Sequence, residues 1–154
     1  MPWIIRAVTA AGLAVDAYVH FDLAALYAEA GGAINESVLF RVEAAAALLA
    51  AVAVIATGRR VCYLAGLAVG GTALAAMLVS RYVDLGQLGP FPDLYDPVWF
   101  PEKLLAAFAE GAACVMAVAG AIITRSNPKS PPKADPRHRR LAGKSSESTG
   151  GSAP

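Results

Sequence analysis

Ionisable side chains interrupt long apolar stretches of this sequence, and their types suit metal or proton chemistry. Asp16 and His20 are four residues apart, so a helix places both on one face. Carboxylates and an imidazole are oxygen and nitrogen ligands of Zn²⁺ and similar divalent ions. Buried carboxylates are also the usual proton sites inside membranes. The candidate site comprises Asp16, His20, Glu43, Arg81 and Glu110.

Three interpretations of this site are open on the sequence. In the first, a metal ion is bound by the three acids and the histidine, Asp16, His20, Glu43 and Glu110, although no recognised spacing motif marks them. In the second, the same acids handle protons or other ions. In the third, the acids are neutralised in structural ion pairs with Arg81 and with two further counter-charges, Arg41 and Lys103.

The sequence contains no cofactor-binding or catalytic motif that would indicate an enzyme. His20 is the only histidine in the apolar stretches, which excludes bis-histidine haem ligation within one chain. The sequence also lacks CxxC, GxSxG, P-loop and dinucleotide-binding patterns. It therefore favours a protein without catalysis of its own and names no cofactor.

Four apolar stretches carry these residues, over residues 3–27, 37–57, 61–83 and 101–124. A helix rises 1.5 Å per residue, so about 20 residues cross a hydrocarbon core of roughly 30 Å. Hydrophobic residues make up 56% of the chain and charged residues 16%, with a mean hydropathy of +0.50, unlike an average soluble domain. The sequence predicts an all-α fold, an integral membrane four-helix bundle over residues 1–124. Its GxxxG pattern at Gly66 and Gly70 is expected to serve packing inside the bundle.

The distribution of charge predicts the orientation of the bundle. Arg59 and Arg60 separate the second and third stretches, and residues 125–154 contain seven Lys/Arg against two Asp/Glu. The connections at 29–36 and 84–102 are acid-dominated. By the positive-inside rule both termini then lie in the cytoplasm, and the intramembrane charges other than Arg6 fall in the outer leaflet. This predicts one polar cavity that is open toward the outer face.

The two ends of the chain carry weaker signals. Residues 125–154 are rich in Pro, Ser, Gly and Lys/Arg, so this basic tail is predicted to be disordered and cytoplasmic. Its cluster at 137–140 is interpreted as part of a solvated topogenic tail, and no nucleic-acid binding is expected. Residues 28–30 resemble a signal-peptidase site, but ionisable residues separate them from the preceding apolar run, so an uncleaved first helix is expected.

The connection before the fourth stretch has an unusual composition. Residues 86–101 contain four prolines and four aromatic residues. Proline blocks regular helix and sheet, so the segment is predicted to be a stiff, extended cap. Its rings suit the membrane interface. A lid over the cavity and a plain interfacial loop both agree with this composition.

A family resemblance is carried by Arg6 early in the first stretch, by the run at 40–49 and by the turn at 58–60. With four short helices, these features resemble the DoxX-like group of small bacterial membrane proteins. Residues 16–22 differ from the glycine- and lysine-containing end of that group's first helix. Residues 15–24 and 97–110 are also similar to uncharacterised integral membrane proteins of actinomycete-type bacteria. The resemblance implies a bacterial plasma membrane location and no particular activity.

Together these features predict a multi-pass plasma-membrane protein, an accessory or binding protein with an outward-facing polar cavity. The alternative is a small ion-, proton- or metal-handling membrane protein that uses its intramembrane carboxylates and His20. The expected partners are the lipid bilayer and either further copies of the chain or a larger membrane complex.

Overall fold

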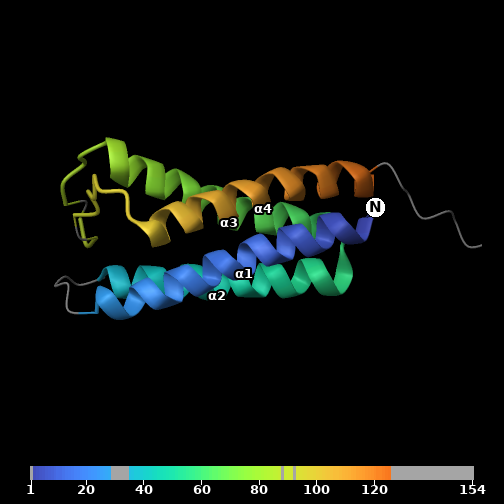
Figure 1. Cartoon of the computed structure of the whole chain (residues 1–154), viewed down its shortest axis with the longest axis horizontal. Helices are drawn as coiled ribbons and strands as arrows, with labels where there is room; N and C mark the ends of the chain where they lie inside the picture. Colours follow the sequence, from blue (N-terminus) through green and yellow to red (C-terminus); the bar gives the residue numbers. More distant parts are fainter. Residues whose placement is uncertain (1, 29–34, 88, 92, 126–154) are drawn as a thin grey trace, which may run out of the picture.

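A computed structural model describes residues 2–28, 35–87, 89–91 and 93–125 as a bundle of four helices (Figure 1). These are α1 (Pro2–Leu26), α2 (Glu36–Thr57), α3 (Arg60–Tyr82) and α4 (Pro101–Arg125). Each begins and ends within one residue of its predicted stretch. The described residues form no strand beyond one isolated bridge, between Gln87 and Asp93, so the all-α fold is confirmed. The tail predicted to be disordered lies outside the described residues, except for Arg125 at the end of α4.

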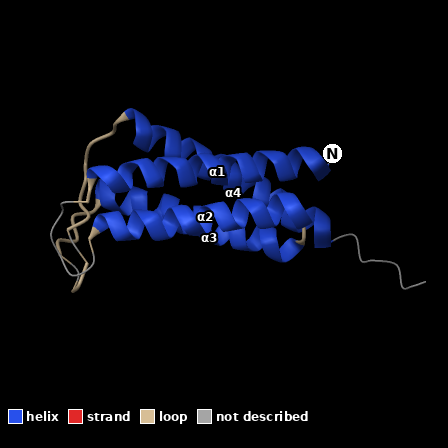
Figure 2. Ribbon diagram, turned by 90° about the horizontal axis from the view of Figure 1, so that it is seen from below, coloured by secondary structure: helices blue, strands red, loops and turns tan. Residues whose placement is uncertain are grey.

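The bundle has two different ends. The N-terminus, the turn between α2 and α3 and the last turn of α4 lie together at one end (Figure 1). The long loop at 83–100 lies at the other end, together with the start of α2 (Figure 2). All four helices have the length and the hydropathy needed to cross a bilayer.

Small residues let the helices approach one another on the inside of the bundle. α1 packs along α2 and α4, and α3 packs mainly along α4. Leu13 of α1 is fully buried and faces Gly66 and Gly70 of α3. A Cβ at Gly66 would lie 3.0 Å from the Leu13 side chain, so a larger residue there would crowd the core. The GxxxG pattern therefore serves packing inside the bundle, as predicted.

The end of α2 is held by a residue of α1. α2 ends at Thr57 and is capped by Gly58, whose φ of 54° is a left-handed conformation that favours glycine. Arg6 Nη2 donates a hydrogen bond of 2.7 Å to the carbonyl oxygen of Thr57, and its guanidinium occupies the space that a Cβ on Gly58 would need. A cation there also complements the helix dipole. Arg6 thus joins the start of α1 to the end of α2.

Large apolar side chains point outward from the bundle. Leu49 is 71% exposed and Phe108 is 76% exposed, and they belong to a long series of such residues on all four helices. So much exposed apolar surface is unusual for a monomeric soluble protein. A lipid surround accounts for it, and the fold fits a membrane protein.

One close contact between α3 and α4 gives a test of this packing. Gly120 lies against the buried ring of Tyr63, where a Cβ would overlap the ring. We expect Gly120→Ala to lower the free energy of unfolding by about 1–3 kcal/mol, because the added methyl group has no room. Gly111→Ala, on the same helix, meets nothing within 4 Å and should not destabilise the protein. Unfolding by SDS in mixed micelles, followed by circular dichroism, measures both variants, and equal stabilities would contradict the contact.

Candidate functional site

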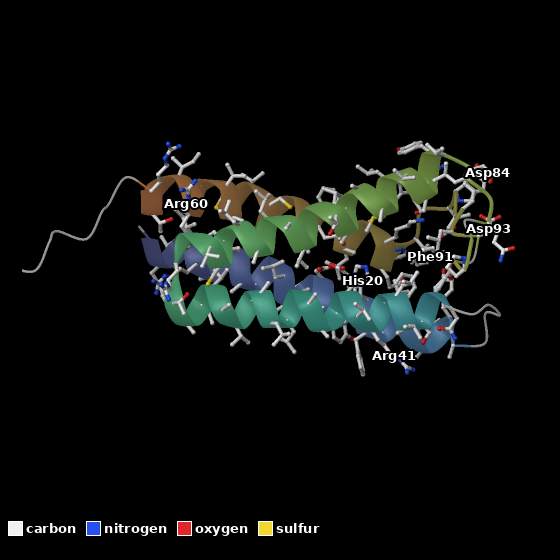
Figure 3. All side chains as sticks on the ribbon, turned by 180° about the vertical axis from the view of Figure 1, so that it is seen from behind. His20, Arg41, Arg60, Asp84, Phe91 and Asp93 are labelled. Atoms are coloured by element: carbon white, nitrogen blue, oxygen red, sulfur yellow. The ribbon has the colours of Figure 1, made fainter. Side chains whose placement is uncertain are left out.

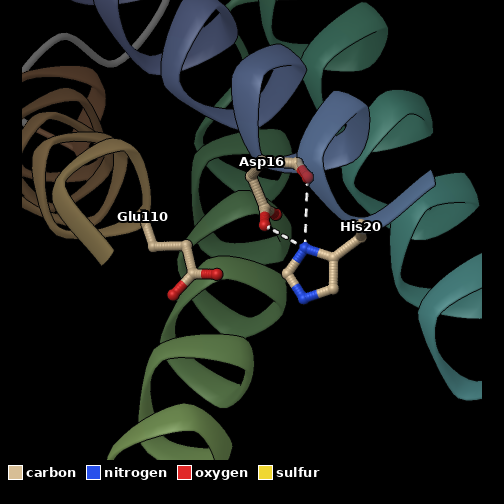
Figure 4. Close-up of side chains that lie close together, drawn as sticks. All are labelled: Asp16, His20 and Glu110. Atoms are coloured by element: carbon tan, nitrogen blue, oxygen red, sulfur yellow. Dashed lines mark hydrogen bonds and ion pairs between the residues drawn. The ribbon is translucent and has the colours of Figure 1, made fainter. Parts of the chain in front are cut away.

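The packing of α1 against α4 brings three ionisable side chains together. Asp16 and His20 point from α1 toward Glu110, which points toward them from α4 (Figure 4). One ligand-type atom of each residue lies within 4.8 Å of those of the other two. We call these three residues the buried cluster. Glu43, the fourth residue of the predicted metal set, is not within this distance of all three.

The hydrogen bonds of His20 fix its tautomer. Its Nδ1 lies 3.1 Å from the backbone carbonyl oxygen of Asp16 and 2.7 Å from Oδ1 of the same residue. A carbonyl oxygen only accepts hydrogen bonds, so Nδ1 must carry the hydrogen. Asp16 therefore orients the imidazole, and Nε2 has no hydrogen-bond partner among the described residues.

The two carboxyl groups of the buried cluster accept few hydrogen bonds. Asp16 and Glu110 both have an exposed fraction of 0%. Within the described part of the chain, no N–H or hydroxyl group donates to either carboxylate oxygen of Glu110 or to Oδ2 of Asp16, and the side-chain partner of Glu110 is the carboxyl group of Asp16, with which it can share a proton. A buried carboxylate without a partner is costly, so it takes up a proton or binds a cation. The buried cluster therefore needs a positively charged species in addition to the His20 ring.

A cavity of about 390 Å³ lies beside the buried cluster, among α2, α3 and the first turns of α4. His20 and Glu43 line it, whereas Asp16, Arg81 and Glu110 do not. The sequence predicts instead a single polar cavity lined by all five residues. The difference arises because Asp16 and Glu110 are enclosed where α1 packs on α4, which leaves His20 as the link between the buried cluster and the cavity.

The wall of the cavity is mostly apolar, with side chains such as Leu39, Phe40, Met77 and Phe100. Its charged groups are three carboxylates and one amine, with His20 beside them: Glu36, Glu43, Asp96 and Lys103. Oε1 of Glu43 is buried and accepts no hydrogen bond from the described residues. The wall thus combines an apolar surface with an excess of hydrogen-bond acceptors.

The cavity opens sideways between α2 and α3. Val42 of α2 lines the cavity and is 63% exposed on the outside of the bundle. Thr72 and Ala76 of α3 also line it and are exposed. This side of the bundle is the surface that a bilayer would surround.

The two counter-charges predicted from the sequence lie in other surroundings. Lys103 Nζ lies 3.0 Å from Oδ2 of Asp96 and donates a hydrogen bond of 2.8 Å to the Asp96 carbonyl oxygen. The loop returns over the start of α4 and so supplies Lys103 with a carboxylate from outside the helices. Arg41 is exposed and points away from the bundle (Figure 3). Neither residue neutralises the acids of the buried cluster.

Arg81 is held by aromatic rings. Its guanidinium lies 5.1 Å from the ring centroid of Tyr82 and 5.9 Å from that of Trp99, which are cation–π contacts. The ion pairs in the described ranges join His20 to Asp16 and Lys103 to Asp96. Among the described residues, no Lys or Arg forms an ion pair with Asp16, Glu43 or Glu110.

The loop at 83–100 closes one end of the cavity. The amide of Asp96 donates a hydrogen bond of 2.9 Å to the carbonyl oxygen of Ser80, and Leu94, Asp96 and Phe100 line the cavity. Tyr27, just after α1, lines the same end. Burial raises the pKa of the Tyr27 phenol, and the nearby carboxylates of Asp96 and Glu36 raise it further. Tyr27 therefore stays a neutral hydrogen-bond donor at neutral pH.

Three residues of this end were not foreseen from the sequence: Tyr27, Glu36 and Asp96. They stand at or beyond helix ends, where aromatic and charged residues are common in any membrane protein, so no pattern singles them out. One usable signal is Asp96 followed by Pro97, because this dipeptide favours a turn that sends the chain back over the bundle.

No family model, curated protein or solved structure matches this chain, so the site is interpreted from its own geometry.

The ion pair at the closed end of the cavity gives a second test. We expect Lys103→Met to loosen the loop, because the pair with the partly exposed Asp96 contributes on the order of 1 kcal/mol. The Asp96 amide should then exchange its hydrogen about fivefold faster, as measured by hydrogen–deuterium exchange with mass spectrometry. The matched variant Arg41→Met removes an exposed cation and should leave this exchange unchanged. Equal exchange in both variants would show that the ion pair does not hold the loop.

Proposed function

We propose that this chain is a multi-pass plasma-membrane binding protein, without catalysis of its own, whose cavity takes an amphiphile with a positively charged amine. One observation carries the proposal: a mostly apolar wall is combined with carboxylates that no Lys or Arg of the described residues fully neutralises. Ligand sites of this type join a broad apolar surface to a few placed polar groups.

The charge of the wall supports an amine. Glu36, Glu43 and Asp96 contribute carboxylates, and Lys103, the only amine among the described residues of the wall, already binds Asp96. The unpartnered Oε1 of Glu43 is a buried acceptor, and an ammonium group supplies up to three donors. An anionic ligand would add to the repulsion among these acids.

The shape of the wall supports an amphiphile that arrives from the membrane. The cavity opens between α2 and α3, on the side of the bundle that lipid would surround. An alkyl chain can pass through this opening without crossing a polar barrier, and Leu39, Phe40 and Met77 offer it an apolar surface. The volume of about 390 Å³ suits a small ligand.

The location and orientation belong to the same proposal. We place the chain in a bacterial plasma membrane with both termini in the cytoplasm, on the positive-inside rule and on the DoxX-like resemblance. The arrangement that supports this has Arg59, Arg60 and Arg125 at one end of the bundle and the acidic loop at the other. The cavity then opens in the outer leaflet.

A second function is favoured by the buried cluster. Asp16, His20 and Glu110 form a group that needs a bound cation or proton, and His20 connects it to the cavity. A small ion- or proton-handling protein would use these residues.

The amine proposal is tested with n-octylamine and octanoate, two probes with the same chain length and opposite charge. In nanodiscs, octylamine at about ten times its Kd should raise the Tm by about 3–6 °C, since linkage then gives about 1.4 kcal/mol. Octanoate should give no rise. Glu43→Gln should lose the octylamine effect, and Glu102→Gln should keep it, because Glu102 is exposed and does not line the cavity. Equal stabilisation by octanoate, or an unchanged shift in Glu43→Gln, would reject the proposal.

The orientation is tested with reporter fusions in a bacterial host. A green fluorescent protein joined after Arg125 should fluoresce, because that end of the bundle is placed in the cytoplasm. Alkaline phosphatase joined within the loop at 83–100 should be active, because the loop is placed outside. The opposite pattern would invert the topology and put the cavity in the inner leaflet.

A further inference from the structure

We infer that the buried cluster of Asp16, His20 and Glu110 is a binding site for one divalent transition-metal ion of the Zn²⁺ class. The inference rests on the second proposed function, ion handling, and names the ion. The protein supplies three ligands: one imidazole nitrogen and one carboxylate oxygen from each acid.

The first support is the distance between the donor atoms. All three lie within 4.8 Å of one another. Ligand atoms that bind a tetrahedral Zn²⁺ at about 2.0–2.2 Å lie about 3.3–3.6 Å apart, so side-chain rotations that move the donor atoms together by about 1 Å bring the set to binding distance. The donors come from two helices whose close packing already fixes their backbones.

The second support is charge. Two ionised carboxylates and a neutral imidazole carry −2, which a divalent ion neutralises. No Lys or Arg in the described ranges pairs with Asp16 or Glu110. Both acids are fully buried, so bulk water does not take that role.

The third support is the vacant hydrogen-bonding capacity of Glu110. It is fully buried, points toward Asp16 and His20, and within the described residues receives no hydrogen bond from an N–H or hydroxyl group; its one side-chain partner is the second acid, Asp16 (Figure 4). A structural glutamate in the interior is expected to be satisfied by hydrogen bonds. An ion among the three side chains satisfies it.

The cavity offers the ion a path and a free coordination position. His20 is the member of the buried cluster that lines the cavity, and Glu43 lines it as well. A site with three protein ligands leaves the fourth position of Zn²⁺ to water or to a small ligand from the cavity. Glu43, outside the set of three, lies where an entering cation passes.

The inference is tested on the full chain, purified without a polyhistidine tag, stripped with chelator and returned to nanodiscs. Zn²⁺ is added and the bound metal is counted by elemental mass spectrometry, and Co²⁺ absorption reports the coordination number. We expect one ion per chain. His20→Gln and Glu110→Gln should each weaken binding at least about tenfold.

The chain contains its own control, because His138 is its only other histidine. His138→Gln should bind the ion as the unmodified chain does. Helical circular dichroism and a single size-exclusion peak must show that each variant is folded, and Glu110→Gln keeps the size of the side chain while removing its charge.

Two outcomes overturn the metal site: no bound ion in the folded chain, or full binding in both Glu110→Gln and His20→Gln. Proton uptake by the stripped chain in liposomes separates this failure from that of ion handling. If the chain binds no metal but takes up protons, and Glu110→Gln abolishes that uptake, the metal site is rejected and the proposed ion or proton handling is retained. If the unmodified chain neither binds metal nor takes up protons, the proposed ion or proton handling is rejected as well.

Discussion

A charge enclosed by apolar helices must be compensated by its immediate neighbours, and the rest of this structure depends on how that is arranged for Asp16 and Glu110. His20 gives one partner to Asp16, at 2.7 Å. The basic side chains that could neutralise these acids make other contacts at the loop end of the bundle. Lys103 forms an ion pair with Asp96, and Arg81 forms cation–π contacts with aromatic rings. Acids therefore collect inside the bundle and cations at its end, and this separation is the basis of the proposed binding of a positively charged ligand in the cavity.

Small residues determine where the acids can meet. A Cβ at Gly12 would lie 2.7 Å from the carbonyl oxygen of Ala109, so only glycine lets α1 come this close to α4. Gly12 is one turn before Asp16, and Ala109 is next to Glu110, so the same contact sets the spacing of the two carboxyl groups. The gap between α2 and α3 is lined instead by longer side chains such as Leu39 and Met77, and there the cavity remains. The distribution of small and large side chains therefore determines both where the two acids meet and where the cavity remains.

The sequence was sufficient for some levels of this structure and not for others. Helix bounds follow from hydropathy and length, which act locally, and they agree to within one residue. The depth of a residue follows from the rise per residue, so the common level of Asp16 and Glu110 was foreseeable. The direction in which a side chain points depends on which helix face is packed, and apolar residues surround these helices on all sides. Arg41 therefore turned out to face away from the bundle, and the capture of Lys103 by Asp96 depends on a loop path that composition alone does not determine.

α4 links the two ends of the cavity region mechanically. Lys103 and Glu110 are seven residues apart, two helical turns, so they lie on one side of a single stiff rod. One holds the loop that closes the cavity, and the other belongs to the buried cluster beside it. A displacement of α4 would therefore move the loop contact and the buried cluster together. Under the proposed function, an occupant would instead enter and leave between α2 and α3, where the cavity opens.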